Sequence, residues 1–98
     1  MFFKVHKSYR DVIAICDSEL IGKKFEEENF QLEVKENFFK GEEISPEKLI
    51  SIIRDYSKED ATFNIVGEKS INLALKCCII NKEGIKKIQD IPFAMVLG

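Results

Sequence analysis

The stretch Gly67-Glu68-Lys69-Ser70 has residue types found at the end of a phosphate-binding loop, where backbone N–H groups and a lysine hold a nucleotide. Such a loop needs further glycines upstream, so that several N–H groups converge on the anion, and Thr62 and Phe63 stand there instead. Glu68 would also place a carboxylate where the phosphate should bind. We therefore interpret Gly67 as a turn and Glu68 as the first residue of a helix, and we expect no cofactor.

The cysteines and the acidic residues do not have the spacing of a metal site. Cys77 and Cys78 would project about 100° apart from one helix, and Cys16 is isolated in the sequence. The run Glu26-Glu27-Glu28 lacks the pattern of a calcium loop. We expect no metal, and cysteines that behave as small hydrophobic residues in a cytoplasmic protein.

Basic residues recur near aromatic rings in two segments, and this arrangement can hold single-stranded RNA through phosphate contacts and base stacking. One segment surrounds Tyr9, and the other surrounds Phe38 and Phe39. The alternative interpretation is that the rings form the core and the lysines are solvated, because a small domain must bury most of its rings. The candidate RNA contacts are Lys4, His6, Lys7, Arg10, Lys35 and Lys40.

Length and composition predict one soluble globular domain spanning residues 1–98. The hydrophobic fraction is 45%, the charged fraction is 33% and the net charge is −2. This charge balance argues against a broad surface for duplex DNA. No apolar run reaches the roughly 20 residues that span a bilayer, and the N-terminus lacks the order of a signal peptide. We expect a cytoplasmic protein with no membrane contact.

Periodicity predicts five main strands and two main helices. Alternating or β-branched residues predict strands over 1–8, 11–16, 30–35, 62–66 and 93–97, with a shorter one over 85–88. The first two form an antiparallel hairpin. Residues 23–29 read as a charged connection, and Phe38-Phe39 as a short strand or turn. Pro92 should lie at a strand's start or at a sheet edge.

Capping signals locate the helices. Ser45 is a natural N-cap and Pro46 suits the first position of a helix that ends near residue 58. A second helix is predicted over 68–80, and Asp17 is expected to cap a short turn over 18–21. These elements predict an α+β fold, with a mostly antiparallel β-sheet and two main helices packed on one face.

Several short motifs occur along the chain in an order and spacing that resemble a known family. They are CDSELIGK (16–23), LEV (32–34), FFKG (38–41), NIVGEK (64–69), AL (74–75) and IPFAM (91–95). In this order they are similar to the archaeal family catalogued as domain of unknown function 424, nearly from end to end. The resemblance implies an archaeal, cytosolic, stand-alone domain and points to no activity. Members often carry a histidine after the tail proline, where this chain has Phe93.

Three functions remain open. The first is a non-enzymatic accessory module that binds a protein or ribonucleoprotein partner, with a homodimer as a variant, because the second helix is broadly apolar and the C-terminal segment 93–97 is apolar. The second is direct RNA binding through the basic segments. The third is a small enzyme with a carboxylate and lysine site near Asp17 and Glu68, for which no nucleophile–base pair is visible. A binding patch is predicted where two glycine-ended motifs lie side by side, with the residues Asp17, Glu19, Gly22, Lys23, Asn64, Gly67, Glu68 and Lys69.

Overall fold

Strands and helices alternate irregularly along the chain, whose computed structural model describes residues 1–97. The strands are β1 (Phe2–His6), β2 (Val12–Cys16), β3 (Lys24–Glu27), β4 (Phe30–Glu33), β5 (Glu42–Glu43), β6 (Thr62–Val66), β7 (Lys86–Ile88) and β8 (Ile91–Leu97). The helices are α1 (Glu36–Phe39), α2 (Pro46–Ser57) and α3 (Glu68–Lys76), with 3-10 turns η1 (Ser18–Leu20) and η2 (Lys82–Gly84).

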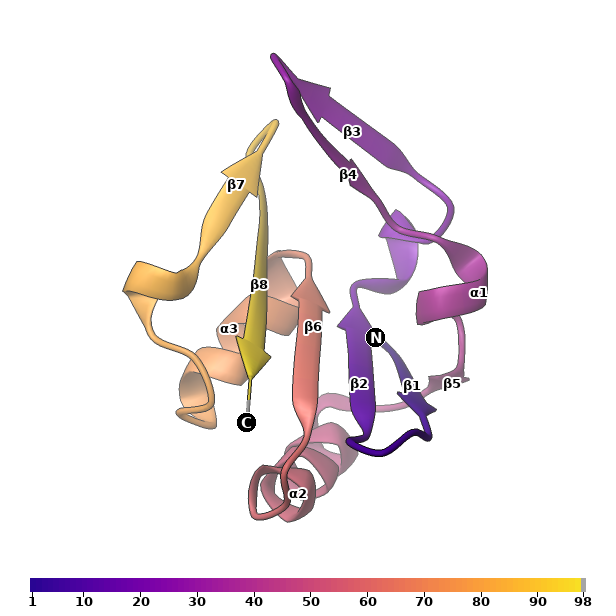
Figure 1. Cartoon of the computed structure of the whole chain (residues 1–98), viewed down its shortest axis with the longest axis vertical. Helices are drawn as coiled ribbons and strands as arrows, with labels where there is room; N and C mark the ends of the chain where they lie inside the picture. The colour runs from indigo at the N-terminus through magenta and orange to yellow at the C-terminus, as the bar shows by residue number, and fades with distance from the viewer. Residues whose placement is uncertain (98) are drawn as a thin grey trace.

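A six-stranded sheet with the order β5-β1-β2-β6-β8-β7 forms the middle of the molecule (Figure 1). Its neighbours are antiparallel except β2 and β6, which are parallel. The hairpin β3–β4 forms a separate two-stranded sheet. The expected α+β class with a mostly antiparallel sheet is therefore confirmed, as are the β1–β2 hairpin and the position of Pro92 near the start of β8.

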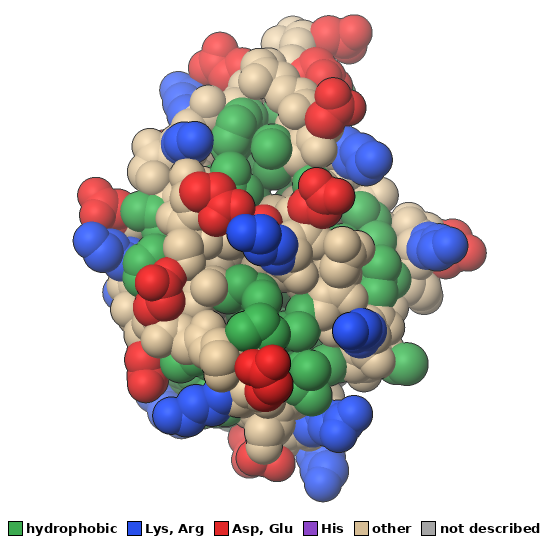
Figure 2. All heavy atoms as spheres, turned by 180° about the vertical axis from the view of Figure 1, so that it is seen from behind, with side chains coloured by type: hydrophobic (Ala, Val, Ile, Leu, Met, Phe, Trp, Pro, Cys, Tyr) green, Lys and Arg blue, Asp and Glu red, His purple; other side chains and the backbone are tan. Residues whose placement is uncertain are grey.

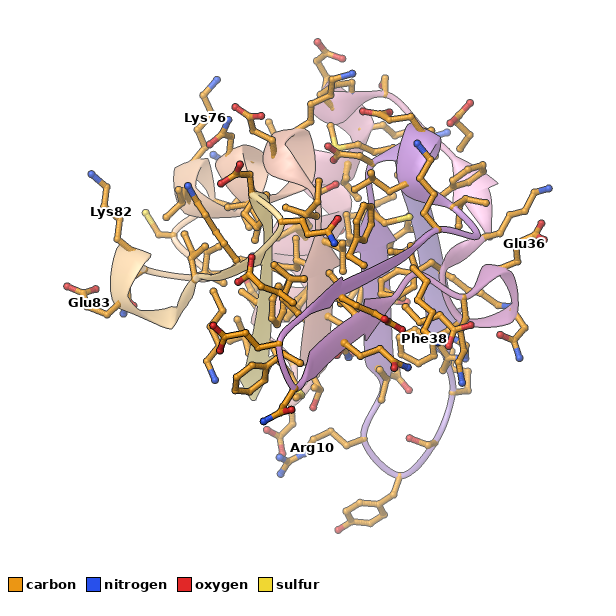
Figure 3. The ribbon with its side chains drawn as sticks, turned by 90° about the horizontal axis from the view of Figure 1, so that it is seen from above. Arg10, Glu36, Phe38, Lys76, Lys82 and Glu83 are labelled. Atoms are coloured by element: carbon orange, nitrogen blue, oxygen red, sulfur yellow. The ribbon has the colours of Figure 1, made fainter. Side chains whose placement is uncertain are left out.

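The main core lies on the back face of the sheet, which α2 and α3 cover (Figures 1 and 3). Ser45 caps α2, because its Oγ accepts from the N–H of Lys48 at 3.4 Å. Leu49 and Ile53 on the inner side of α2 are 0% and 1% exposed. Burial of each such side chain contributes about 1.5–3 kcal/mol, so these contacts fix α2 on the sheet, as the buried Ile71 and Ala74 fix α3.

The front face is covered only in part. Val34, which follows β4, and Phe39 of α1 pack with Cys16 of β2 in a second, smaller core. Further along the same face, Asn64 of β6 is half-buried and Met95 of β8 is 66% exposed. The front face of the sheet is therefore covered by α1 and the β3–β4 hairpin at one end and is open over β6 and β8.

The tips of two hairpins meet above this front face. Gln89, in the turn between β7 and β8, donates its backbone N–H to Oε1 of Glu27 at 3.2 Å. Its side-chain Nε2 donates to the carbonyl of Glu26 at 2.6 Å. Gln89 and Asp90 have φ values of 49° and 65°, the signs expected of a two-residue type I′ turn. The contact ties the β3–β4 hairpin to the opposite side of the sheet.

Three local expectations were wrong. Residues 24–27 form a strand and not a connection, because they pair with β4. Phe38 and Phe39 lie in the one-turn helix α1 and not in a strand or turn. Helix α3 ends at Lys76, four residues before the predicted end, since Cys78 adopts a left-handed φ of 60°. A left-handed residue just after a helix ends it and redirects the chain.

Candidate functional site

Asp17 caps a helix far along the chain and not the turn that follows it. One carboxylate oxygen accepts from the N–H of Lys69 at 3.0 Å, and the other accepts from the N–H of Ser70 at 2.8 Å. The Ser70 hydroxyl donates to the same carboxylate at 2.7 Å. These are the N–H groups of the second and third positions of α3, which an N-cap side chain normally satisfies. The expectation that Asp17 caps its own turn was therefore wrong.

Gly67 occupies the N-cap position of α3 without a side chain of its own. It has φ 111° and ψ 153°, a region of backbone space that is almost restricted to glycine. A Cβ at this position would lie 2.3 Å from Cγ of Asp17. The carboxylate thus occupies the space of the missing side chain, and the acidic group also complements the positive end of the helix dipole.

The predicted binding patch is brought together only in part. Nζ of Lys69 lies 3.6 Å from Oε1 of Glu19, and Glu68 lies beside them around a hollow of about 430 Å³. The pKa of the Glu19 carboxyl lies below its usual range, first because the carboxylate accepts a hydrogen bond from its own backbone N–H and second because the ammonium of Lys69 lies close to it. Gly22 and Lys23 instead form the base of the β3–β4 hairpin, through backbone bonds to Val34.

Asp17 itself is 3% exposed, and both of its carboxylate oxygens accept hydrogen bonds from α3. The patch near Asp17 is thus a structural junction. Asn64, the remaining member of the predicted patch, lies elsewhere, on the front face of the sheet.

The six candidate RNA contacts lie in β1 (Lys4 and His6), in the exposed β1–β2 loop (Lys7 and Arg10) and at the two ends of α1 (Lys35 and Lys40). Nζ of Lys4 donates to the carbonyl of Asn37 at 2.7 Å, and Nε2 of His6 donates to the carbonyl of Phe38 at 2.8 Å. The rings of His6 and Phe38 are stacked, with centroids 4.6 Å apart.

The remaining four differ in whether an acidic side chain lies close. Arg10, on a loop that projects from the sheet (Figure 3), pairs with Asp60 at 2.7 Å. Lys7 pairs with Asp11 at 3.2 Å, and this hydrogen bond raises the pKa of Lys7. Lys40 pairs with Glu36 at 3.5 Å. Lys35 is exposed and forms no ion pair within the described residues, so it alone of these four has a free ammonium.

A cleft of about 590 Å³ opens on the front face between the β3–β4 hairpin with α1 on one side and β7 with β8 on the other. Its volume falls within the range of sites for small molecules or for a few side chains of a partner. Its walls are mainly apolar, and they include Leu32, Phe38, Phe39, Val66, Phe93 and Met95.

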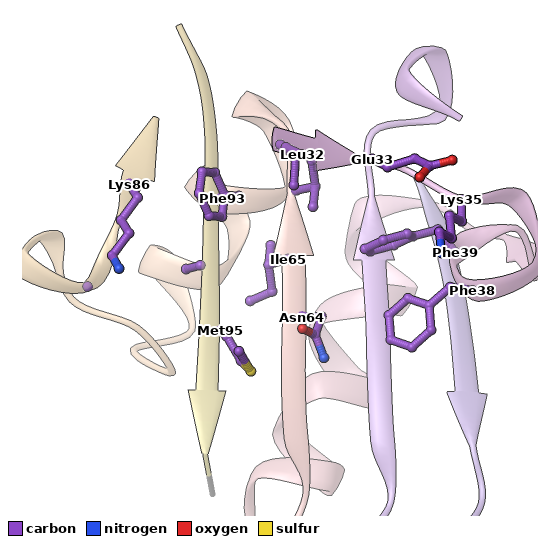
Figure 4. Close-up of a pocket in the computed structure, with 13 residues that line it drawn as sticks. Leu32, Glu33, Lys35, Phe38, Phe39, Asn64, Ile65, Lys86, Phe93 and Met95 are labelled. Carbon is purple, nitrogen blue, oxygen red and sulfur yellow. The ribbon is translucent and has the colours of Figure 1, made fainter. Parts of the chain in front are cut away.

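Four polar side chains line the same cleft. Figure 4 shows Lys86 and Phe93 on one side, Lys35 and Phe38 on the other, and Asn64 between them. Among the described residues that line the cleft, Glu33 is the one with a carboxylate. The arrangement combines flat apolar walls, an amide that can both donate and accept, and two cations, which suits the binding of a ligand.

No cluster of three metal-ligating side chains occurs within residues 1–97. Cys16 is fully buried, and burial raises the pKa of its thiol to about 12. Cys77 is half-buried against the main core and Cys78 is exposed, so the expectation that the cysteines behave as small hydrophobic residues fits Cys16 and Cys77 but not Cys78. In the same part of the chain, no helix is long and apolar enough to cross a membrane.

Sequence reasoning missed most of the cleft. Phe93 and Met95 alternate along β8, so that both reach the front face, and this period-two pattern was the available signal. Lys86 and Leu32 come from other strands, and only the tertiary arrangement of the hairpins brings them to the same cleft.

The protein is a small α+β domain, because it has a mixed sheet with two helices behind it and a partly covered cleft in front. Within that class, the chain belongs to the family described as protein of unknown function (DUF424), which it matches over residues 6–98. It also resembles the crystal structure of an uncharacterized conserved protein from Methanopyrus kandleri, with a TM-score of 0.84 and 19% identity over 98% of this chain and 90% of that one. This likeness shows the fold alone. No curated protein matches the chain.

Proposed function

We propose that the protein is a non-enzymatic accessory module that binds a protein or ribonucleoprotein partner in the cytoplasm of an archaeal cell. The observation that carries this proposal is the cleft of about 590 Å³ on the half-covered front face. The cleft combines mainly apolar walls with a few polar groups, as binding sites do.

The exposed part of the cleft supports binding. Among the side chains that the structure describes, three large hydrophobic ones are strongly exposed, those of Tyr9, Phe30 and Met95, and of these Met95 alone lines the cleft. Apolar side chains that remain in water beside a concave surface mark interaction sites more often than scattered ones do. By contrast, both carboxylate oxygens of Asp17 are occupied in capping α3, which leaves the carboxylate and lysine alternative without a free group at that position.

Affinity capture from the native cells tests the proposal. Tagged wild-type protein is compared with Met95→Glu, which puts a charge into the cleft, and with Tyr9→Glu, which changes an exposed ring outside it. We expect the same partner with the wild type and Tyr9→Glu, and its loss with Met95→Glu. An RNase-treated sample separates a protein partner from a ribonucleoprotein.

Equal capture by Met95→Glu and the wild type would contradict the proposal. A second copy of the chain is the simplest alternative partner, and sedimentation equilibrium of the three proteins tests it. A dimer that dissociates only in Met95→Glu would identify the front face as a self-association surface.

A further inference from the structure

We infer that the cleft binds a short single-stranded RNA segment, with one base against Phe93 and the flanking phosphates at Lys35 and Lys86. The inference rests on the proposed function and names the chemistry of its partner. Three features of the cleft carry it: the charge of its rim, the rings of its walls and the amide on its floor.

Basic side chains share the front face of the sheet with the rings that line the cleft. Side chains alternate between faces along a strand, so Lys4 and His6 of β1 share the front face with Phe2, and Lys86 shares it with its pairing partner Phe93. Strands β1, β2, β6, β7 and β8 contain no acidic residue, and at the far edge of the sheet Glu43 of β5 pairs with Phe2 and so faces the front. The chain as a whole has a net charge of −2, and Figure 2 shows both signs interspersed over the back.

The two lysines at the cleft are available for an anion. Lys35 and Lys86 are exposed, and neither forms an ion pair within residues 1–97. They lie on opposite sides of the cleft (Figure 4). Glu33 lines the cleft too, so the rim carries two positive charges against one negative charge. Two separated cations on one cleft suit the phosphates on either side of a bound base.

The walls and the floor suit a base. Phe93 and Phe38 come from opposite sides of the cleft, and aromatic side chains provide the surfaces on which unpaired bases stack. Asn64 lies between them, and its side chain makes no hydrogen bond within the described residues. An amide presents a donor and an acceptor together, which matches the edge of a base. A peptide with an aromatic residue and acidic neighbours is the competing occupant.

Titration followed by amide NMR shifts tests the inference on the intact protein. The probes are short oligo-uridine, short oligo-adenosine and an acidic peptide that contains phenylalanine. We expect either RNA to shift the amides of Asn64, Phe93 and Met95, with an affinity that falls as salt rises. The peptide should leave these amides unchanged.

Adjacent lysines of β7 provide a matched pair of variants. Lys86 lines the cleft, whereas Lys87 lines a hollow beside α3. Lys86→Glu should weaken RNA binding, and Lys87→Glu, with the same change in net charge, should not. In the double variant Lys35→Ala/Lys86→Ala, the slope of log affinity against log salt should fall by about 1.4, at about 0.7 per phosphate contact.

Absence of RNA-induced shifts, shifts caused by the peptide alone, or equal effects of Lys86→Glu and Lys87→Glu would each overturn the inference. Circular dichroism shows whether each variant is folded. The proposed function is judged separately, by the capture experiment with Met95→Glu. If a protein partner survives RNase and is lost with Met95→Glu, the proposed accessory module stands and the inference of RNA binding falls.

Discussion

At the scale of single residues, Asp17 links the end of β2 to the start of α3. It satisfies two backbone N–H groups and the hydroxyl of Ser70, which is 1% exposed. Loss of a cap costs about 0.5–2 kcal/mol, and an unpaired buried hydroxyl costs about 1–3 kcal/mol more. We expect Asp17→Ala to lower the free energy of unfolding in urea by about 2–4 kcal/mol. Glu19→Ala, which removes an exposed ion pair, should change it by less than about 0.5 kcal/mol.

Gly67 and Gly22 both have positive φ, 111° and 80°, but their surroundings differ. A Cβ on Gly22 would meet no atom within 4 Å, whereas one on Gly67 would collide with Asp17. Gly22→Ala should therefore cost only backbone strain, about 1–2 kcal/mol, and Gly67→Ala distinctly more. The collision disappears when Asp17 is replaced by Ala. The double variant Asp17→Ala/Gly67→Ala should therefore lose less free energy of unfolding than the sum of the losses in the two single variants. Strict additivity in urea unfolding would contradict this account.

The three thiols should react in the order of their exposure. Cys78 is exposed, while burial raises the pKa of Cys77 and raises that of Cys16 to about 12. The thiolate is the reactive form, so at neutral pH a thiol reagent should modify Cys78 first, Cys77 more slowly and Cys16 only after unfolding. Because the pKa of Cys16 is raised in the folded protein, its contribution to stability should be lost as the pH rises above about 9. Mass spectrometry of a labelling time course checks the order.

At the scale of elements, the β3–β4 hairpin depends on its ends. Its tip is held by two hydrogen bonds from Gln89. Gln89→Ala removes the shorter of these, so we expect faster hydrogen exchange over β3 and β4 and unchanged exchange over β1 and β2. Gln31→Ala, on the same hairpin but without a side-chain bond among the described residues, is the control. Slower or unaltered exchange in Gln89→Ala would show that the tip contact does not restrain the hairpin.

Local signals predicted the elements whose causes are local. Ser45 and Pro46 mark the start of α2 because a cap and a first-turn proline act on neighbouring residues. The bond between Asp17 and Lys69 joins residues 52 positions apart, so no local pattern revealed it. Strand β3 was missed because the sequence KFEE lies mostly in solvent, and its pairing with β4 is what makes it a strand.

At the scale of the whole molecule, the two cores lie on opposite faces of one sheet and share its strands. Unfolding should therefore occur in one step, since neither core retains its strands without the other. In a Tyr9→Phe variant, the remaining Tyr56 reports on the back core, where it packs near Phe3 at 6.4 Å between ring centroids. Its fluorescence and the far-UV circular dichroism should give the same urea midpoint. Two separate midpoints would mean that the faces unfold independently.

The base of the β3–β4 hairpin has a consequence for how members of such a family can diverge. Gly22 donates to the carbonyl of Val34 at 2.8 Å, and Val34 donates to the carbonyl of Lys23 at 2.9 Å. The two ends of the hairpin are thus fastened side by side, and the strands beyond them contribute little to the main core. A segment of different length or composition can close the same short gap at small entropic cost. The β3–β4 hairpin can therefore change during evolution, and one wall of the cleft with it, while the sheet and its helices stay as they are.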